Sequence, residues 1–313
     1  MCIAFFAAAC WGTVVVLNKK VLEYVRPLPV NFLVLTTCTV CLVAVAVPLS
    51  LLDLWPLGFT ITWRAAAWIA GGSAITWLVA FNAFYYALRS GRAGVVGPIT
   101  GTDPLFTALF AVLIVGAALG GLTVAGLVIA TCGVVLISRW MGSEPEPHAP
   151  VLEGTPDAPP LRESAATVVT LSLVTAAGWG FGPVMIQMAE EAAGGASTTM
   201  ILMGEALGVA LLTPFMLRRR TSLFTRTLEP HERRRVLWLI IAAGALNALF
   251  AVLFYVLIEQ IGAVLTAVVV ATSPLFTIAG SALFLDERFS RRLILGAVVT
   301  FAGVLLAVVD GAV

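Results

Sequence analysis

The chain has 313 residues, of which 60% are hydrophobic and 11% are charged, and its mean hydropathy is +1.03. Soluble domains carry roughly a quarter charged residues, so this composition excludes a soluble globular protein and predicts one that is covered by lipid. The net charge of +1 gives no indication of a nucleic-acid partner, because the charged residues are concentrated in short loops.

Ten apolar segments follow one another along the chain, each near the length of about 20 residues that a membrane-spanning helix needs. They comprise residues 1–17, 29–52, 65–88, 93–115, 119–138, 165–188, 197–217, 236–258, 262–285 and 293–309. No basic residue precedes the first segment, so we interpret it as a membrane helix and not as a signal peptide. We therefore predict an all-α, polytopic membrane protein with ten transmembrane helices.

Residues 141–164 separate the fifth segment from the sixth. This stretch contains six prolines and five acidic residues, a composition that cannot bury enough apolar surface to fold. We expect a solvated linker between residues 1–140 and residues 165–313, each of which carries five of the segments.

The distribution of lysine and arginine predicts the orientation in the membrane. With ten spans, 17 basic residues fall on one side and only Arg64 falls on the other. We expect the basic loops and the linker to face the cytoplasm and both termini to lie outside, in a multi-pass protein of the cell membrane.

The two halves of the chain are copies of each other. Residues 85–136 align with 255–306 without a gap, and the run Pro-Leu-Phe-Thr of 104–107 recurs at 274–277. A Trp-Gly pair at 11–12 recurs at 179–180. Because each copy has an odd number of spans, the second must enter the membrane upside down, an arrangement found in many secondary transporters. The fold class that we predict is thus two inverted five-helix repeats.

These motifs resemble those of the EamA-type, ten-helix members of the drug/metabolite transporter superfamily. The resemblance rests on the Trp-Gly pairs, the T-x-P-L-F-T segments and the run L-F-L-D-E-R-F-S-R-R-L-I-L-G of 283–296, and it covers nearly the whole chain. It implies a carrier that moves small metabolites, commonly outward, through a cavity lined by helices one, three, four, six, eight and nine. Two features depart from the family: Gly116-Ala117 replaces a glutamate-containing turn, and the second helix lacks an arginine often found near its start.

Prolines interrupt two of the segments near their middle. Pro104 leaves the carbonyl of Thr100 without its helical partner, Pro274 does the same to Val270, and Pro98 interrupts the fourth segment earlier. Broken helices within a membrane are tolerated mainly where protein or water satisfies the freed groups. The breaks therefore favour a hydrated central site, although prolines that only kink a helix for packing would give the same pattern.

Polar side chains accompany both breaks. Thr100, Asp103 and Thr107 share one helical face, and Ser273 and Thr277 occupy the corresponding face of the other repeat. We predict that these side chains line a substrate or coupling site. Threonine hydroxyls that bond back to their own helix are the alternative.

Asp103 is the most informative of these residues. A charged aspartate at the centre of a membrane costs about 2.5–3.5 kcal/mol on translocon scales, and such residues are usually functional. No lysine or arginine lies within the central segments to pair with it. Asp103 suits proton coupling or a counter-charge for a substrate ammonium group, and a carboxyl group hydrogen-bonded to a neighbouring helix is the alternative. For Glu205 we expect a packing or interface role.

Aromatic side chains form the last group of candidates. They are Trp11, Trp179, Trp77, Phe81, Tyr85 and the repeat partner of Tyr85, Tyr255. Trp11 and Trp179 lie inside their segments, whereas Trp55, Trp63, Trp140 and Trp238 fit the membrane interfaces. A stripe such as 77, 81 and 85 is typical of helix packing. If it lines a cavity, it favours apolar or aromatic solutes.

Several activities lack the residues that they need. Both histidines lie in loops and only one central aspartate is present, which disfavours intramembrane serine and aspartyl proteases, and we expect no enzyme. Carriers of organic phosphates would offer central lysine or arginine to the phosphate. None is present in the central segments, which disfavours such a carrier. The Cys38–Cys41 pair lacks a second ligand pair, so we expect no metal or cofactor.

We therefore expect an alternating-access exporter of small metabolites, with amino acids or similar zwitterions as the leading substrate class. Its partners are the solute and the lipid bilayer, with protons as a candidate coupling ion. The alternative is a membrane scaffold or sensor that transports nothing.

Overall fold

The computed structural model describes residues 2–52, 62–116, 120–141, 164–193, 197–218, 223–270 and 272–310. Helices account for nearly all of these residues, and they include no strand beyond one isolated bridge between Val25 and Phe224, which confirms the all-α class. The linker predicted at 141–164 falls outside the described residues apart from its two ends, so the domain boundaries remain a prediction.

The helices of the first half follow the five predicted segments closely. In chain order they are α1 (Cys2–Leu22), α2 (Pro27–Leu51), α3 (Trp63–Ser73), the π-helix η1 (Ala74–Ala80), α4 (Phe81–Ser90), α5 (Ala93–Thr100), α6 (Asp103–Phe110), the π-helix η2 (Ala111–Val115) and α7 (Gly121–Met141). α3, η1 and α4 run on without interruption and together form the third segment. α5, α6 and η2 together form the fourth, which is broken where Pro104 predicted.

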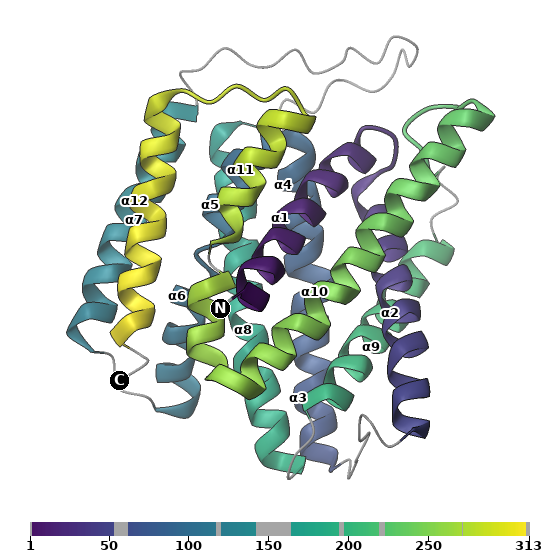
Figure 1. Cartoon of the computed structure of the whole chain (residues 1–313), viewed down its shortest axis with the longest axis horizontal. Coiled ribbons are helices and arrows are strands. Elements are labelled where there is room, and N and C mark those ends of the chain that lie inside the picture. The colour runs from purple at the N-terminus through teal and green to yellow at the C-terminus, as the bar shows by residue number, and fades with distance from the viewer. Residues whose placement is uncertain are drawn as a thin grey trace.

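The second half contains fewer and longer helices. They are α8 (Ala165–Ala193), α9 (Ser197–Arg218), α10 (Pro230–Val270), α11 (Ser273–Phe284) and α12 (Arg291–Asp310). α10 differs from the prediction, because helical geometry continues through residues 259–261, where we expected two spans to be separated. A straight helix of 41 residues would measure about 60 Å, roughly twice the hydrocarbon thickness. Figure 1 shows α10 running down across the bundle and turning back before α11.

Ten transmembrane spans are not confirmed. Within the described residues, six helical stretches are long and apolar enough to cross a membrane: Phe5–Leu22, Pro27–Leu51, Trp63–Ser90, Ala93–Ile114, Ala165–Ala193 and Pro230–Phe254. Gly121–Ile137 and Ser273–Phe284 are apolar but shorter. The break before Ser273 shortens the last of these, since it divides the predicted ninth segment between α10 and α11.

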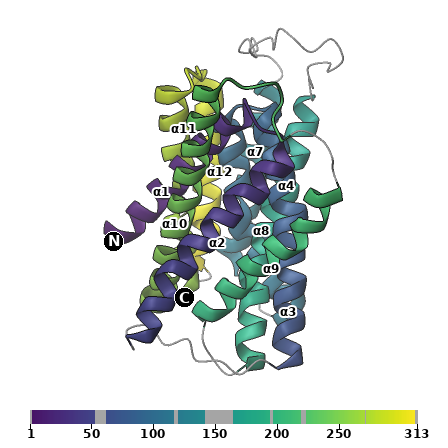
Figure 2. The ribbon, with the colours of Figure 1, turned by 90° about the vertical axis from the view of Figure 1, so that its right-hand side faces the viewer.

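α7 and α12 lie side by side at one edge of the bundle (Figure 1), while α2 and α9 lie at the opposite edge (Figure 2). An added Cβ on Gly133 of α7 would overlap the backbone of Thr300, and one on Gly303 of α12 would overlap the backbone of Ala130. The repeat alignment pairs Gly133 with Gly303 and Ala130 with Thr300. The contact is therefore reciprocal, as expected of a twofold relation between the repeats, and the absence of a side chain at these glycines permits the close packing of α7 and α12.

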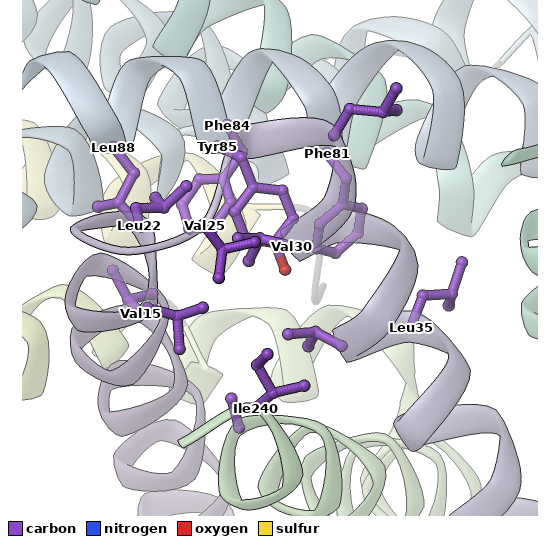
Figure 3. Close-up of a cluster of buried hydrophobic side chains, with 14 of the residues drawn as sticks. Val15, Leu22, Val25, Val30, Leu35, Phe81, Phe84, Tyr85, Leu88 and Ile240 are labelled. Carbon is purple, nitrogen blue, oxygen red and sulfur yellow. The ribbon is translucent and has the colours of Figure 1, made fainter. Parts of the chain in front are cut away.

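The largest core cluster joins α1, α2, α4, α8 and α10. Figure 3 shows Phe84 and Tyr85 of α4 beside Leu22, the last residue of α1, and Val25, which follows it. Tyr85 and Phe84 are among the largest fully buried side chains. α4, to which several site candidates belong, is thereby fixed against helices of both repeats.

Several basic residues lie at one end of the bundle, which we call the basic end: Lys19, Arg26, Arg89, Arg92, Arg226 and Arg288. At this end Thr225 N donates to Tyr24 O (2.9 Å), which joins the loop before α10 to the turn after α1. Arg92 Nη1 donates to Arg288 O (3.1 Å) at the same end. Arg64 begins α3, which runs through η1 into α4, so it lies at the opposite end from Arg89. Arg64 is thus separated from the residues of the basic end, and the orientation of the protein in the membrane stays a prediction.

Candidate functional site

The two helix breaks have the same local structure. After α5, Leu105 N donates to Thr102 O, and after α10, Leu275 N donates to Thr272 O, each at 3.0 Å. Pro104 and Pro274 occupy the second positions of α6 and α11, where a missing N–H costs nothing because the first turn has no helical partner for it. Pro98 lies within α5. The breaks at Pro104 and Pro274 are therefore regular helix starts placed in the interior of the fold.

Each break is covered by a glycine from the opposite repeat. An added Cβ on Gly180 of α8 would lie 2.5 Å from Asp103 O and 2.8 Å from Thr107 N. An added Cβ on Gly12 of α1 would lie 2.9 Å from Ser273 O and 3.0 Å from Thr277 N. These glycines belong to the repeated Trp-Gly pairs, so the repeat detected in sequence corresponds to a repeated contact in space. Only glycine lets α1 and α8 approach the broken helices this closely.

The hydroxyl groups near the breaks bond to their own helices. Thr100 Oγ1 donates to Gly97 O (3.0 Å), Thr107 Oγ1 to Asp103 O (3.2 Å) and Thr277 Oγ1 to Ser273 O (3.2 Å). This is the back-bonding that the sequence left open as an alternative. The hydroxyl oxygens keep lone pairs that can accept a hydrogen bond, so the threonines remain candidates as acceptors and no longer as free donors.

Asp103 begins α6 directly beneath Gly180, and its side chain is half-buried. In the described part of the chain, its carboxylate makes no hydrogen bond or ion pair with another residue. A crevice between α5, α7 and α12 is too small for a water molecule and is lined by Val95, Ile137 and Leu293, not by Asp103. The hydrated central chamber and the role of Asp103 in it both stay predictions.

The aromatic candidates from different helices converge on one cluster. The ring centroids of Trp11 and Trp179 lie 5.3 Å apart, and that of Phe81 lies 5.0 Å from Trp179. Phe84 lies 5.0 Å from Trp179 and is completely buried. The sequence stripe omitted Phe84, although it lies one turn beyond Phe81. This cluster links α1, α4 and α8, and therefore both repeats, through ring contacts.

Three further aromatic residues extend the cluster or fall outside it. Trp77 stacks on Phe81 at 4.3 Å, and Phe250 of α10 lies 5.1 Å from Trp11. Tyr85 lies 5.3 Å from Phe84, and its ring is buried. The side chain of Tyr255 lies outside the described residues, so its predicted role stays untested.

The π-helix η1 places Trp77 in this cluster. Wider π turns disturb the regular bonding of the helix and often occur at functional sites. The carbonyl oxygen of Trp77 accepts hydrogen bonds from Asn31 Nδ2 (2.8 Å) and Asn82 Nδ2 (3.2 Å), and that of Ala80 accepts one from Thr175 Oγ1 (3.2 Å). Asn31 and Thr175 are buried and come from other helices. Sequence reasoning missed this support, because buried amides carry no charge or helix-breaking signal.

Among the buried polar atoms that have no partner within the described residues, one belongs to Trp179 and one to Glu205. Trp179 Nε1 is a buried donor without an acceptor, and one carboxylate oxygen of Glu205 is a buried acceptor without a donor. Cys38 of α2 lies beside Glu205, and Asn247 of α10 lies beside Cys38. Glu205 therefore belongs to an interface between α9, α2 and α10, in keeping with the role expected for it. Trp179, whose ring belongs to the aromatic cluster, keeps an unused N–H.

Paired helix breaks, reciprocal glycine contacts and an aromatic centre shared by two repeats define a helical membrane protein of the duplicated, transporter-like class. The model of the EamA-like transporter family matches residues 1–139 and again 166–309. The chain belongs to this family, whose members are membrane-embedded transporters of small molecules. The two matches coincide with the repeats inferred from the internal alignment.

Similarity in structure extends over almost the whole chain. A solved structure described as "Crystal structure of protein" covers 97% of this chain and 94% of its own, with 16% sequence identity and a TM-score of 0.62. At this identity the likeness concerns the fold alone. No curated protein matches the chain in sequence.

Proposed function

We propose that this member of the EamA-like family is a secondary carrier that exports a small zwitterionic metabolite, such as an amino acid, by alternating access. The family supplies the general activity, a membrane transporter of small molecules. The substrate class, the outward direction and the coupling to protons are the proposal. The observation that carries it is the reciprocal contact of Gly12 and Gly180 with the two helix breaks.

This contact supports alternation between two conformations. Each broken helix of one repeat rests against a helix of the other, at corresponding residues. The two repeats can adopt slightly different conformations and exchange them. When they do, one end of the bundle closes while the other end opens. The chain would then expose its centre to each side of the membrane in turn.

Two unpaired groups support a zwitterionic substrate. Asp103 offers a carboxylate that no described side chain neutralises, which suits a substrate ammonium group or a coupling proton. Trp179 Nε1 offers an unused donor, which suits a substrate carboxylate. The rings around Trp179 add surface for the apolar part of a solute and attract cations through their faces.

Flux measurements in proteoliposomes test the proposal. Purified wild-type protein would be reconstituted and screened with radiolabelled amino acids and related zwitterions, with and without a pH gradient. The Asp103→Asn variant keeps the shape of the side chain but cannot carry a charge, and we expect it to lose the flux driven by the gradient. The Glu205→Gln variant is the matched control, because it alters the other buried carboxylate, and it should retain flux.

Other outcomes identify the competing explanations. Equal flux in wild type and Asp103→Asn would exclude Asp103 from binding and coupling. An absence of flux for every solute, with a stable complex to another protein, would support the scaffold or sensor and reject the carrier.

A further inference from the structure

A lysine at the basic end binds the end of a helix from the same repeat. Lys19 Nζ of α1 donates to the carbonyl oxygens of Leu88 (2.6 Å), Gly91 (2.7 Å) and Arg89 (3.3 Å). The last carbonyl groups of a helix have no helical partners and carry partial negative charge. The ammonium group therefore caps the C-terminus of α4 and holds α1 against it.

A glutamate from the second repeat binds the next helix start in the same way, with opposite charge. Glu287 is 7% exposed, and its two carboxylate oxygens accept hydrogen bonds from Ala93 N (2.9 Å) and Gly94 N (3.2 Å). These N–H groups begin α5, where a helix carries partial positive charge. Glu287 thus caps the N-terminus of α5, and its carboxylate lies within electrostatic reach of the Lys19 ammonium group.

Both caps act on the short turn between α4 and α5. Lys19 joins α1 to one side of this turn, and Glu287 joins the loop before α12 to the other. Asp286, directly before Glu287, has a left-handed backbone with φ of 53°, as does Gly116 at the equivalent position of the first repeat with φ of 76°. The left-handed residue before Glu287 therefore has a counterpart in the first repeat, whereas the carboxylate has none.

The corresponding positions of the other repeat carry neither charge. The repeat partner of Lys19 is Gln187, and that of Glu287 is Ala117. Gln187 Nε2 donates to Glu191 Oε1 of its own helix at 3.1 Å, and does not join α8 to another element through this bond. The two ends of the bundle are therefore equivalent in backbone, but they differ in side chains: the charges of Lys19 and Glu287 have no equivalent at the opposite end.

We propose that Lys19 and Glu287, which we call the basic-end caps, are positioning residues that make the protein rest with its basic end closed and its opposite end accessible. This inference rests on the proposed alternation between two conformations. Bonds to the ends of α4 and α5 that exist only in one conformation stabilise that conformation alone. Because hydrogen bonds to buried charged groups are strong, losing one cap changes the ratio of the two conformations about tenfold or more.

Accessibility of two matched cysteines tests the proposal without a known substrate. In a variant with the five native cysteines replaced, Asn18→Cys reports on the basic end, because Asn18 is buried next to Lys19. Ile186→Cys, at the repeat-equivalent position of α8, reports on the opposite end. Each would be labelled in sealed vesicles of known sidedness with a charged, membrane-impermeant thiol reagent. The caps would be changed to the residues of the other repeat, Lys19→Gln and Glu287→Ala.

We expect either cap variant to raise the labelling rate of Asn18→Cys about tenfold and to lower that of Ile186→Cys. With Lys19→Arg, which keeps the positive charge, both rates should equal those measured with Lys19. Unchanged rates would overturn the proposal, and so would a rise at both positions, which indicates a loosened fold. The outcome is independent of the flux experiment. Reciprocal labelling without flux for any solute would reject the carrier and keep the caps, whereas flux that depends on Asp103 without reciprocal labelling would reject the caps alone.

Discussion

Replacing Gly180 by alanine tests whether α8 packs against the helix break before α6. The added methyl group would lie 2.5 Å from the carbonyl oxygen of Asp103, 2.6 Å from Phe106 Cβ and 2.8 Å from Thr107 N. Two of these atoms belong to the backbone, so the overlap cannot be relieved by rotating a side chain. Overpacking a close contact of this kind costs about 1–3 kcal/mol.

The matched control is Gly71→Ala, which also lies inside a helix, α3. Its added Cβ would meet nothing within 4 Å. Both substitutions gain helix propensity, of about 1 kcal/mol relative to glycine. The difference between the two variants therefore isolates the cost of the overlap at Gly180.

Unfolding in mixed micelles, followed by tryptophan fluorescence as the fraction of denaturing detergent rises, measures this difference. We expect Gly180→Ala to be less stable than Gly71→Ala by about 1–3 kcal/mol, with Gly12→Ala behaving like Gly180→Ala because its contact is the repeat equivalent. Equal stability of Gly180→Ala and Gly71→Ala would refute the close contact between α8 and the break.

Two further substitutions test other contacts of the fold. Asn31→Ala removes a hydrogen bond to the carbonyl oxygen of Trp77. It should lower the free energy of unfolding by about 1–3 kcal/mol, because the buried carbonyl loses a donor. A shift of the tryptophan emission would report the change around Trp77, whereas unaltered emission and stability would contradict the importance of this bond. Gly303→Ala places a methyl group on the backbone of Ala130 and should destabilise the α7–α12 pair. Gly121→Ala, which meets nothing within 4 Å, serves as its control, and equal melting of the two variants would exclude the contact.

The internal repeat predicted more of the structure than any single motif did. The alignment of the two halves, read from letters alone, relates Gly133 to Gly303 and Pro104 to Pro274, and both pairs occupy equivalent places in the fold. Such pairs are predictable because glycine and proline act through the backbone, and their effect on the backbone follows from the residue type alone. The family match over both halves confirms the recognition made from the same motifs.

Contacts between distant side chains were not predictable in the same way. Lys19 was counted as one of many loop charges, although it binds three carbonyl groups that are remote in sequence. Asn31 carried no signal, because an amide inside an apolar segment has several equally plausible uses. The sequence analysis ends one apolar segment at residue 258 and begins the next at 262, whereas the helix α10 continues between them, where no proline is present to end it.

Interlocking of the two halves has a consequence for how the protein is made. The break before α11 is covered by Gly12, near the beginning of the chain, and the break before α6 is covered by Gly180, which the ribosome adds only after the whole first half has been synthesised. During synthesis, the break before α6 therefore stays uncovered in the bilayer until α8 has been made and inserted. Each half supplies surface that the other lacks, so we expect neither half to reach its native packing when it is expressed alone.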